Sequence, residues 1–345
     1  MGKCCQEGGV GIPRRGLAKK ERSESLSTPG VLVIHMDSFI PATRPHLMVL
    51  CMDVACMSRV GGIDSDMSDY IWMNGKICHL CEARISPLDH GFLVGDGVFE
   101  TLVARMGRPF AANAHWQRLV NSCTITGLSP MPKADFLAAM DAVLQANELT
   151  EARIRVTLTS GDGPLGSERG NSAQMFTVSA SPLRGWPDTE KVCLVPWTRN
   201  ETGALTGVKS TSYGENVRAL AHAKAQGCGE ALLANTRGEL CEGTGSNLFI
   251  VVGGRLLTPP LTSGCLAGVT RHLVLRACSQ NGIPCHETAI PISQLISCEE
   301  AFLTSSTRDV HPISQVDSRD LAAPGSITTR VSTAFRELAS EFVLA

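Results

Sequence analysis

Short strand-like runs alternate with amphipathic helices from about residue 70 onward, and this alternation constrains the fold more than any other feature of the chain. The segment YIWMNGKICHL (70–80) has two apolar runs around Asn74-Gly75, which is the signature of a β-hairpin. The segment KADFLAAMDAVLQANELT (133–150) has apolar residues at helical spacing and predicts a helix that ends at Asn147. The pattern therefore predicts domains that combine sheets with helices.

The regular pattern falls into two blocks that follow an irregular extension. Residues 1–66 mix glycine, proline and charge without an apolar period, so we expect a disordered or irregular segment there. Residues 67–185 predict a small α+β domain, and residues 186–345 predict a larger α/β domain. The segment SPLRGWPDTE (181–190) has the proline and glycine expected of a linker between them.

The overall composition indicates a soluble globular protein with no general affinity for nucleic acid or membranes. The chain has 345 residues, 43% of them hydrophobic, and a formal net charge of −2. Its fourteen cysteines are spread widely and follow no signal peptide, which favours a reducing cytoplasm. The apolar run HLMVLCMDVACM (46–57) is too short to span a bilayer and is broken by Asp53.

Two short motifs carry little functional weight in this sequence. Cys78 and Cys81 form one CxxC, but no second pair stands at a distance suitable for zinc, so no metal is expected. GDGPLG (161–166) fits the dinucleotide-binding pattern, but Pro164 and a strand follow where that motif needs a helix. We interpret it as a loop between strands.

Lys209 and Glu242 suggest a cofactor site when they are considered together. Lys209 follows a strand-like segment and precedes a helix that starts near Glu215; alone it is typical of a solvated charge. Glu242 lies just before a glycine-rich turn and a strand, where a carboxylate is costly unless it has a partner. A lysine that forms a Schiff base with an aldehyde cofactor needs a carboxylate that keeps the pyridine nitrogen protonated, because the protonated ring stabilises a carbanion.

The second block also offers two candidate sites for the phosphate of such a cofactor. Gly268, Val269 and Thr270 open a helix whose first backbone N–H groups have no intrahelical partner. LTSSTRD (303–309) has four consecutive hydroxyl residues after a strand. Either segment alone is typical of an ordinary helix cap or Ser/Thr turn, but the four features in one domain favour a cofactor.

These residues resemble the fold-type IV pyridoxal-phosphate enzymes, the class IV aminotransferase family. KSTSYGEN (209–216), CEGTGSNLF (241–249) and SGCLAGVTRHLVL (263–275) carry the resemblance in the second block. ISPLDHGFLVGDGVFETL (85–102) and AHWQRL (114–119) match the N-terminal pattern of the family. The resemblance covers roughly residues 70 to 340 and does not reach residues 1–66.

The resemblance implies a small N-terminal α+β domain and a larger, β-barrel-like α/β domain with the active site between them. It also implies pyridoxal 5'-phosphate as cofactor, a small amino compound as substrate and a homodimer. Lys209 would bind the cofactor and move the α-proton, and Glu242 would pair with the pyridinium nitrogen. The other implied positions are Arg118, Gly268, Val269, Thr270 and Ser306 at the phosphate, Tyr213 at the ring hydroxyl after a one-residue shift, and Thr101, Arg155 and Thr307 on the substrate side.

The sequence leaves three functional hypotheses in a definite order. The wording of the motifs most resembles aminodeoxychorismate lyases, which convert 4-amino-4-deoxychorismate to pyruvate and the folate precursor 4-aminobenzoate. A branched-chain-type aminotransferase comes second, since Arg155 matches an arginine of those enzymes but Thr101 replaces their usual glycine. The arginine of D-amino-acid aminotransferases falls near Ser160, which argues against that activity. A non-catalytic binding relative comes last, because Lys209 and Glu242 are both intact.

Overall fold

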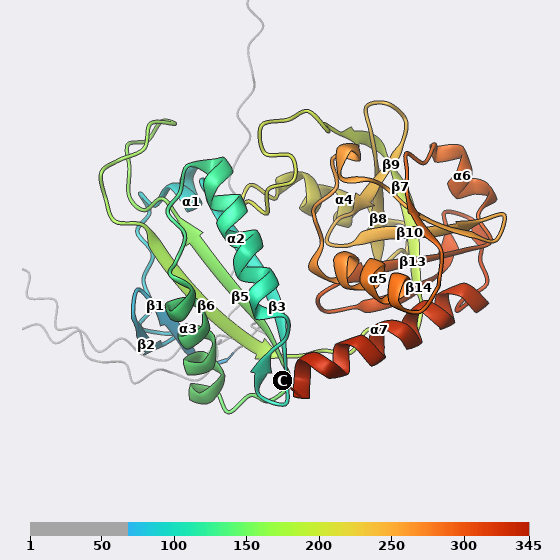
Figure 1. The fold of residues 1–345 in the computed structure, drawn as a ribbon. Coiled ribbons are helices and arrows are strands. Elements are labelled where there is room, and N and C mark those ends of the chain that lie inside the picture. The colour runs from blue at the N-terminus through green and yellow to red at the C-terminus, as the bar shows by residue number, and fades with distance from the viewer. Residues whose placement is uncertain (1–67, 345) are drawn as a thin grey trace, which may run out of the picture. The chain divides into compact units, whose positions relative to one another are not determined.

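The computed structural model describes residues 68–344, and these residues contain two β-sheets with helices packed on them (Figure 1). The predictions for residues 1–66 and for the apolar run 46–57 therefore lie outside the described residues. Residues 183–189 connect the last strand of the first sheet to the first strand of the second. The proposed domain boundary at residues 185 and 186 falls in this connection and stays a prediction.

The first sheet has six antiparallel strands, and the short-range signals of the sequence account for most of it. Asn74 and Gly75 have φ of 46° and 101°, the backbone that a tight hairpin turn requires, and they join the first two strands as predicted. The strand order is β2 (Lys76–His79), β1 (Tyr70–Met73), β6 (Met175–Pro182), β5 (Ala152–Thr159), β3 (Gly97–Arg105) and β4 (Arg108–Pro109). The GDGPLG segment is the loop between β5 and β6 that the sequence analysis expected.

The two longer helices of this region cover one face of the first sheet, whereas the other face carries the site and, beside Thr159, the shortest helix. The helices of this region are α1 (His90–Leu93), α2 (Ala112–Thr126) and α3 (Lys133–Ala146), the last capped by Asn147 as predicted. Along β5, Ile154 and Val156 are fully buried in the core under the helices, while Arg153 and Arg155 point to the opposite face.

The second sheet has nine strands and mixed topology. Its order is β12 (Cys285–Glu287), β11 (Arg255–Thr258), β10 (Asn247–Val252), β13 (Glu300–Ser305), β14 (Asp309–Val316), β7 (Glu190–Arg199), β8 (Glu230–Asn235) and β9 (Leu240–Gly243), with β15 (Arg319–Asp320) beside β14. β9 forms one end of this order and β10 lies near the other, yet only residues 244–246 connect them. The sheet must therefore curl back on itself, which gives the half-barrel that the sequence analysis expected.

Helices of the C-terminal region pack around this curled sheet (Figure 1). They are α4 (Gly214–Ala225), α5 (Val269–Gln280), α6 (Ile292–Ser297) and α7 (Ser326–Leu344), with one 3-10 turn, η1 (Leu261–Ser263). No helix in the described range 68–344 is long and apolar enough to cross a bilayer.

The segment before Lys209 differs from its prediction. It is not strand-like: β7 ends at Arg199, and turns fill most of the connection that follows. The Lys209 carbonyl instead accepts a 2.9 Å hydrogen bond from the N–H of Phe99, and Ser210 forms a bridge with Val98. This pairing is possible because β4 covers only the end of β3, at residues 104 and 105, and leaves the start of β3 with an open edge. Lys209 is thereby held where the two sheets meet.

We predict that truncation of the aromatic pair in the second core is strongly destabilising. Phe249 and Phe302 are cross-strand partners, fully buried, with ring centroids 4.8 Å apart and planes 7° from parallel. Phe302→Ala should lower the free energy of unfolding by about 3–5 kcal/mol, since it leaves a cavity that the neighbours fill poorly. Urea denaturation measures this, with Val217→Ala as control, because Val217 is 65% exposed and its truncation should change stability by less than about 0.5 kcal/mol. Equal effects of the two substitutions would contradict the prediction.

Candidate active site

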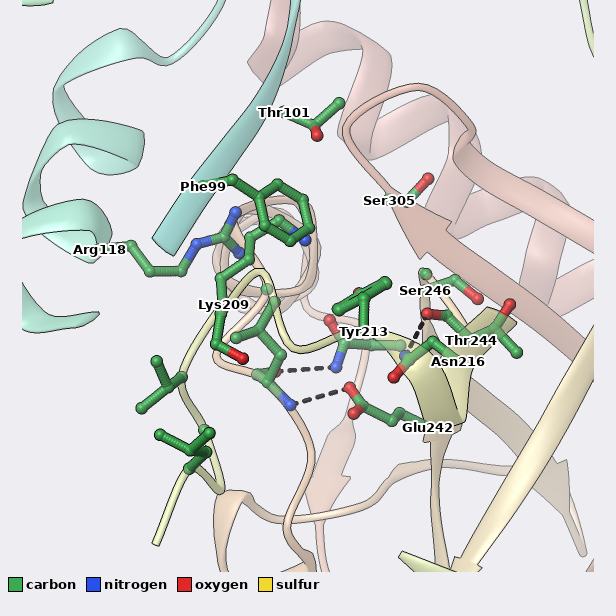
Figure 2. Close-up of a pocket in the computed structure, with 18 of the residues that line it drawn as sticks. Phe99, Thr101, Arg118, Lys209, Tyr213, Asn216, Glu242, Thr244, Ser246 and Ser305 are labelled. Atoms are coloured by element: carbon green, nitrogen blue, oxygen red, sulfur yellow. Dashed lines mark hydrogen bonds between the residues drawn. The ribbon is translucent and has the colours of Figure 1, made fainter. Parts of the chain in front are cut away.

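A cavity of about 810 Å³ lies between the two sheets and brings all of the sequence-predicted residues together (Figure 2). Its walls come from β3 and β5, from the connection that carries Lys209, from the turn after β9, from the start of α5 and from the end of β13. The predicted residues that line it are Thr101, Arg118, Arg155, Lys209, Tyr213, Glu242, Gly268, Val269, Thr270, Ser306 and Thr307. Their common location is a geometric fact, and their individual roles stay predictions.

Lys209 is a buried amine whose proton is weakly held. Its side chain is 9% exposed, and Nζ lies 4.4 Å from the ring centroid of Phe99 and 5.7 Å from that of Tyr213. Burial lowers the pKa of Lys209 to about 8, and the charge of Arg118 acts in the same direction. Part of the amine is therefore neutral near neutral pH, as a nucleophile or a proton acceptor requires.

Glu242 lies across the cavity on β9, where burial opposes its charge. Burial raises the pKa of this carboxyl, while the charge of Arg199 and a backbone hydrogen bond lower it. Leu266 N–H donates to Oε2 at 2.9 Å, which is the dashed line that ends at Glu242 in Figure 2. Arg199 Nη2 lies 3.6 Å from Oε1. Nε and Nη2 of Arg199 are buried without a hydrogen-bond partner among the described residues. The charges of Glu242 and Arg199 are thus only partly satisfied by hydrogen bonds. The Glu242 carboxylate can still accept a hydrogen bond from a further N–H group in the cavity.

Arg118 is held by a carboxylate that the sequence analysis missed. Glu100, fully buried on β3, accepts hydrogen bonds from Arg118 Nε at 2.8 Å and Nη2 at 2.6 Å. Nδ1 of His115 lies 2.7 Å from the same carboxylate, and its Nε2 lies 3.4 Å from Ser306 Oγ. Burial alone would raise the pKa of Glu100. The neighbouring Arg118 and His115 outweigh this effect and lower the pKa to about 2. The carboxylate therefore stays ionised and fixes the direction of the guanidinium.

The start of α5 has the features expected of the anion site that the sequence predicted. Gly268 is the N-cap and has no side-chain cap, so the first N–H groups of the helix are free to bind an anion. A Cβ at Gly268 would collide with the side-chain oxygen of Asn247, which explains glycine at this position. Arg118 Nη1 donates to Ala267 O at 3.1 Å, and this brings its charge to the same end of the helix. Thr304 Oγ1, buried nearby in the cavity wall, has no hydrogen-bond partner among the described residues.

The aromatic and substrate-side residues complete the cavity. Tyr213 directly precedes α4 and packs edge-on against Phe99, with ring centroids 5.2 Å apart. Burial raises the pKa of Tyr213 to about 12. Thr101 and Arg155 are cross-strand partners on β3 and β5, and the Arg155 guanidinium lies 3.7 Å from the centroid of the Phe99 ring.

These residues fit pyridoxal phosphate in the chemistry that each one offers. A buried amine, a buried carboxylate facing the cavity, and a helix N-terminus with an arginine correspond to its aldehyde, ring nitrogen and phosphate. Glu100, His115 and Arg199 were not predicted from the sequence. Glu100 and His115 orient Arg118 and Ser306, and the charge of Arg199 balances that of Glu242. A glutamate in the apolar strand VFETL and a His–Arg pair at helical spacing were available signals for the first two.

The lowered pKa of Lys209 predicts a specific pH dependence of stability. The pKa is about 8 in the folded protein and near 10.5 when unfolded, so protonation of this group favours the unfolded state. The folded state of the cofactor-free protein should gain up to about 3 kcal/mol from this group as the pH rises from 8 to 10.5. Lys209→Met should lack this gain, which urea denaturation at several pH values measures. Parallel pH curves for the two proteins would show that the lysine is not perturbed.

Comparison with known proteins identifies the family. The sequence model of the family described as amino-transferase class IV matches residues 97–316. A Methanocaldococcus jannaschii protein named "Putative branched-chain-amino-acid aminotransferase" is 31% identical over 280 residues, which cover 79% of this chain and 97% of the relative. The branched-chain aminotransferase of Thermoproteus uzoniensis, solved with norvaline, is 28% identical with a TM-score of 0.75, and the match covers 79% of this chain and 96% of that one.

A Legionella pneumophila structure described as "Putative 4-amino-4-deoxychorismate lyase" is 23% identical, with a TM-score of 0.72 over 75% of this chain and 97% of that one. At this identity the likeness concerns the fold alone. The expected fold class and the expected cofactor are both confirmed by these comparisons. The chain belongs to the class IV aminotransferases and is a pyridoxal-phosphate-dependent enzyme.

Proposed function

We propose that this enzyme is an aminotransferase of the branched-chain type, which exchanges an amino group between an amino acid and a 2-oxo acid. The observation that carries the choice of substrate class is the 31% identity to the Methanocaldococcus relative over nearly the whole length of that protein. The cavity supports a substrate with an apolar part, since Phe99, Leu205 and Val208 contribute to its wall.

The order of the two enzymatic hypotheses is thereby reversed from the sequence analysis. The motifs favoured an aminodeoxychorismate lyase, but the Legionella protein with that description is similar in fold alone. The lyase stays as second candidate because Thr101, where branched-chain enzymes usually have glycine, places a hydroxyl-bearing side chain in the cavity wall.

The bound cofactor supplies an aldehyde that takes up the amino group and a protonated ring that stabilises negative charge. Lys209 holds the cofactor and moves a proton at Nζ, and its lowered pKa keeps part of the amine neutral for this role. Glu242 holds a proton at the ring nitrogen, and Arg199 stabilises the ionised carboxylate against the effect of burial.

The remaining residues bind the phosphate and shape the cavity. The N–H groups at the start of α5, the Arg118 guanidinium and the Ser306 hydroxyl bind the phosphate oxygens. Glu100 and His115 orient Arg118 and Ser306 through the hydrogen bonds described above. Tyr213 stands beside Phe99 and excludes water from the side of the cavity near Lys209.

A homodimer and a cytoplasmic location are also part of the proposal. Several large apolar side chains around α1 are exposed, which supports an interface there: Phe92 is 74% exposed and Ile85 59%. The measured molar mass of the purified protein in solution tests the dimer.

Two assays distinguish the candidate reactions. With L-leucine and 2-oxoglutarate the holoenzyme should form glutamate, since one cavity must accept both partners in turn. With 4-amino-4-deoxychorismate an aminotransferase should release no pyruvate and no 4-aminobenzoate. Formation of those two products without glutamate would instead establish the lyase.

The two central residues should fail in different ways. The purified protein should be yellow, and borohydride should fix the colour to the chain; Lys209→Ala should lose this covalent adduct.

Glu242→Gln should keep the cofactor but lose at least about 100-fold in kcat, because it removes the charge that stabilises the protonated ring. Glu337→Gln, an exposed position on α7, is the control and should keep full activity. A colourless protein that takes up no pyridoxal phosphate would refute the proposed chemistry, and a fully active Glu242→Gln would refute the role of that carboxylate.

A further inference from the structure

Arg308 is a buried arginine next to the cavity. It ends the turn between β13 and β14, and its N–H donates to Ser305 O at 3.2 Å. Ser305, Ser306 and Thr307 line the cavity, whereas Arg308 is not among the lining residues. The Arg308 side chain is 5% exposed. A charge at this depth is costly without partners, so its partners indicate what the residue does.

Four side chains surround the Arg308 guanidinium. Nη1 donates to Glu190 Oε2 at 2.8 Å and lies 3.0 Å from Nδ1 of His311. Nη2 donates to Glu230 Oε2 at 3.5 Å. The Trp186 ring covers one face of the guanidinium, with its centroid 3.6 Å from Cζ. Only a planar guanidinium can stack on a ring and donate a fork of hydrogen bonds at the same time, so lysine would not replace this residue fully.

The hydrogen bonds of His311 fix the direction of its contact with Arg308. Its Nε2 lies 2.8 Å from Pro187 O, and a carbonyl oxygen only accepts, so Nε2 carries the hydrogen and Nδ1 accepts from Arg308. Burial and the charge of Arg308 lower the pKa of His311, which agrees with a neutral ring. Trp186 and Pro187 belong to the connection between the two sheets, so these contacts attach that connection to Arg308.

Glu230 extends the network to a second turn of the cavity wall. Its carboxylate accepts hydrogen bonds from Thr244 N–H at 3.0 Å and from the Thr244 hydroxyl, and Ser246 Oγ donates to it at 3.4 Å. All three residues of the turn 244–246 line the cavity. Thr244 O accepts in turn from Asn216 Nδ2 at 2.6 Å, which is the dashed line beside Asn216 in Figure 2. One carboxylate thus holds the turn and, through it, the start of α4.

The residue that follows Arg308 binds the first sheet. Asp309 accepts two hydrogen bonds from Arg105 Nη2, at 2.8 and 2.6 Å, and Arg105 ends β3. Asp309 also has φ of 53°, a backbone that is uncommon for residues other than glycine. The turn before Asp309 is therefore held from two sides, in a shape that its own backbone does not favour.

A buried ion-pair network alone is weak evidence of function, because many such networks only fix the fold. Here the four partners of Arg308 do not line the cavity, yet both turns that the network holds do. A network that only stabilised the second sheet would not need to end at two segments of the cavity wall. Its arrangement therefore favours a role in positioning that wall.

We propose that Arg308 is a positioning residue of the active site, which holds the turn 305–308 and, through Glu230, the turn 244–246 in the arrangement that cofactor and substrate need. This inference rests on the proposed function, which assigns Ser306 to the phosphate and Thr307 to the substrate side. Arg308 itself touches neither the cofactor nor the substrate and has no part in the proton transfers.

Binding of the cofactor to the full chain tests the inference without turnover. Equilibrium dialysis measures the Kd of pyridoxal 5'-phosphate, and urea denaturation measures the stability of the same samples. Arg308→Gln should raise this Kd about tenfold, since a residue without ligand contact acts only through the turns. Arg308→Lys keeps the charge but loses the fork and the stack, so it should raise the Kd less. Arg319→Gln is the control, because Arg319 is half-buried and binds the carbonyl groups of Leu295 and Cys298 outside the cavity. It should keep the Kd within about twofold even where it lowers stability.

A change at Trp186 leaves every charge of the network in place. Trp186 is 39% exposed and does not line the cavity, so Trp186→Leu should fold. It removes the ring that covers the Arg308 guanidinium and should raise the Kd about threefold. This variant and Arg308→Lys decide the question if Arg308→Gln does not fold. A wild-type Kd in both would overturn the inference.

Steady-state kinetics separate a positioning role from a purely structural one. At saturating cofactor the Arg308 variants should show a KM for L-leucine that is about fivefold higher, with kcat within about threefold, because Lys209 is held by β3 and not by this network. Lower stability with wild-type Kd and KM would overturn the inference and leave the proposed aminotransferase intact. A wild-type enzyme that forms no glutamate from leucine and 2-oxoglutarate would overturn the proposed function instead, and the Kd comparison would still decide the role of Arg308.

Discussion

The buried Glu100 carboxylate is the interaction on which the arrangement of the cavity depends. It lies in the middle of β3 and binds two groups of α2, the Arg118 guanidinium and the His115 ring. Through these groups it reaches the second sheet, because Arg118 donates to Ala267 before α5 and His115 lies beside Ser306. A buried charge without partners would be strongly destabilising, so the strand, the helix and the residues proposed to bind the phosphate are fixed relative to one another.

Two buried glutamates, Glu242 in the cavity wall and Glu100 behind it, show how partners decide the role of a side chain. Glu100 has three short contacts with Arg118 and His115, and its pKa falls to about 2 in spite of burial. Glu242 has one backbone donor and a guanidinium nitrogen 3.6 Å away, and burial raises its pKa. Glu100 is thus saturated and serves as a support, whereas Glu242 retains capacity for a ligand. Both are glutamates on strands, so residue type alone does not distinguish them.

Structural features that depend on a local pattern or on family motifs were predicted correctly from the sequence. Features that depend on tertiary contacts were not. The Asn74-Gly75 hairpin and the end of α3 at Asn147 follow from turn and cap chemistry, and all predicted site residues do line one cavity. The connection to Lys209 was wrongly interpreted as strand-like. Its position is set by pairing with the open edge of β3, and that edge exists only in the folded sheet. Arg199 was missed since its partner Glu242 lies 43 residues away, at a distance that a local pattern does not reveal.

The distribution of charge separates two functions within one cavity. Where a cation is matched by a carboxylate of the chain, as at Arg118 and Arg308, the guanidinium is already oriented before any ligand binds. Arg153 and Arg155 have no such match among residues 68–344, and both are exposed in the cavity wall, where water can hydrate them. The bound cofactor requires a site that is fixed in advance, whereas the two unmatched guanidinium groups keep long flexible stems and can change position when a ligand binds.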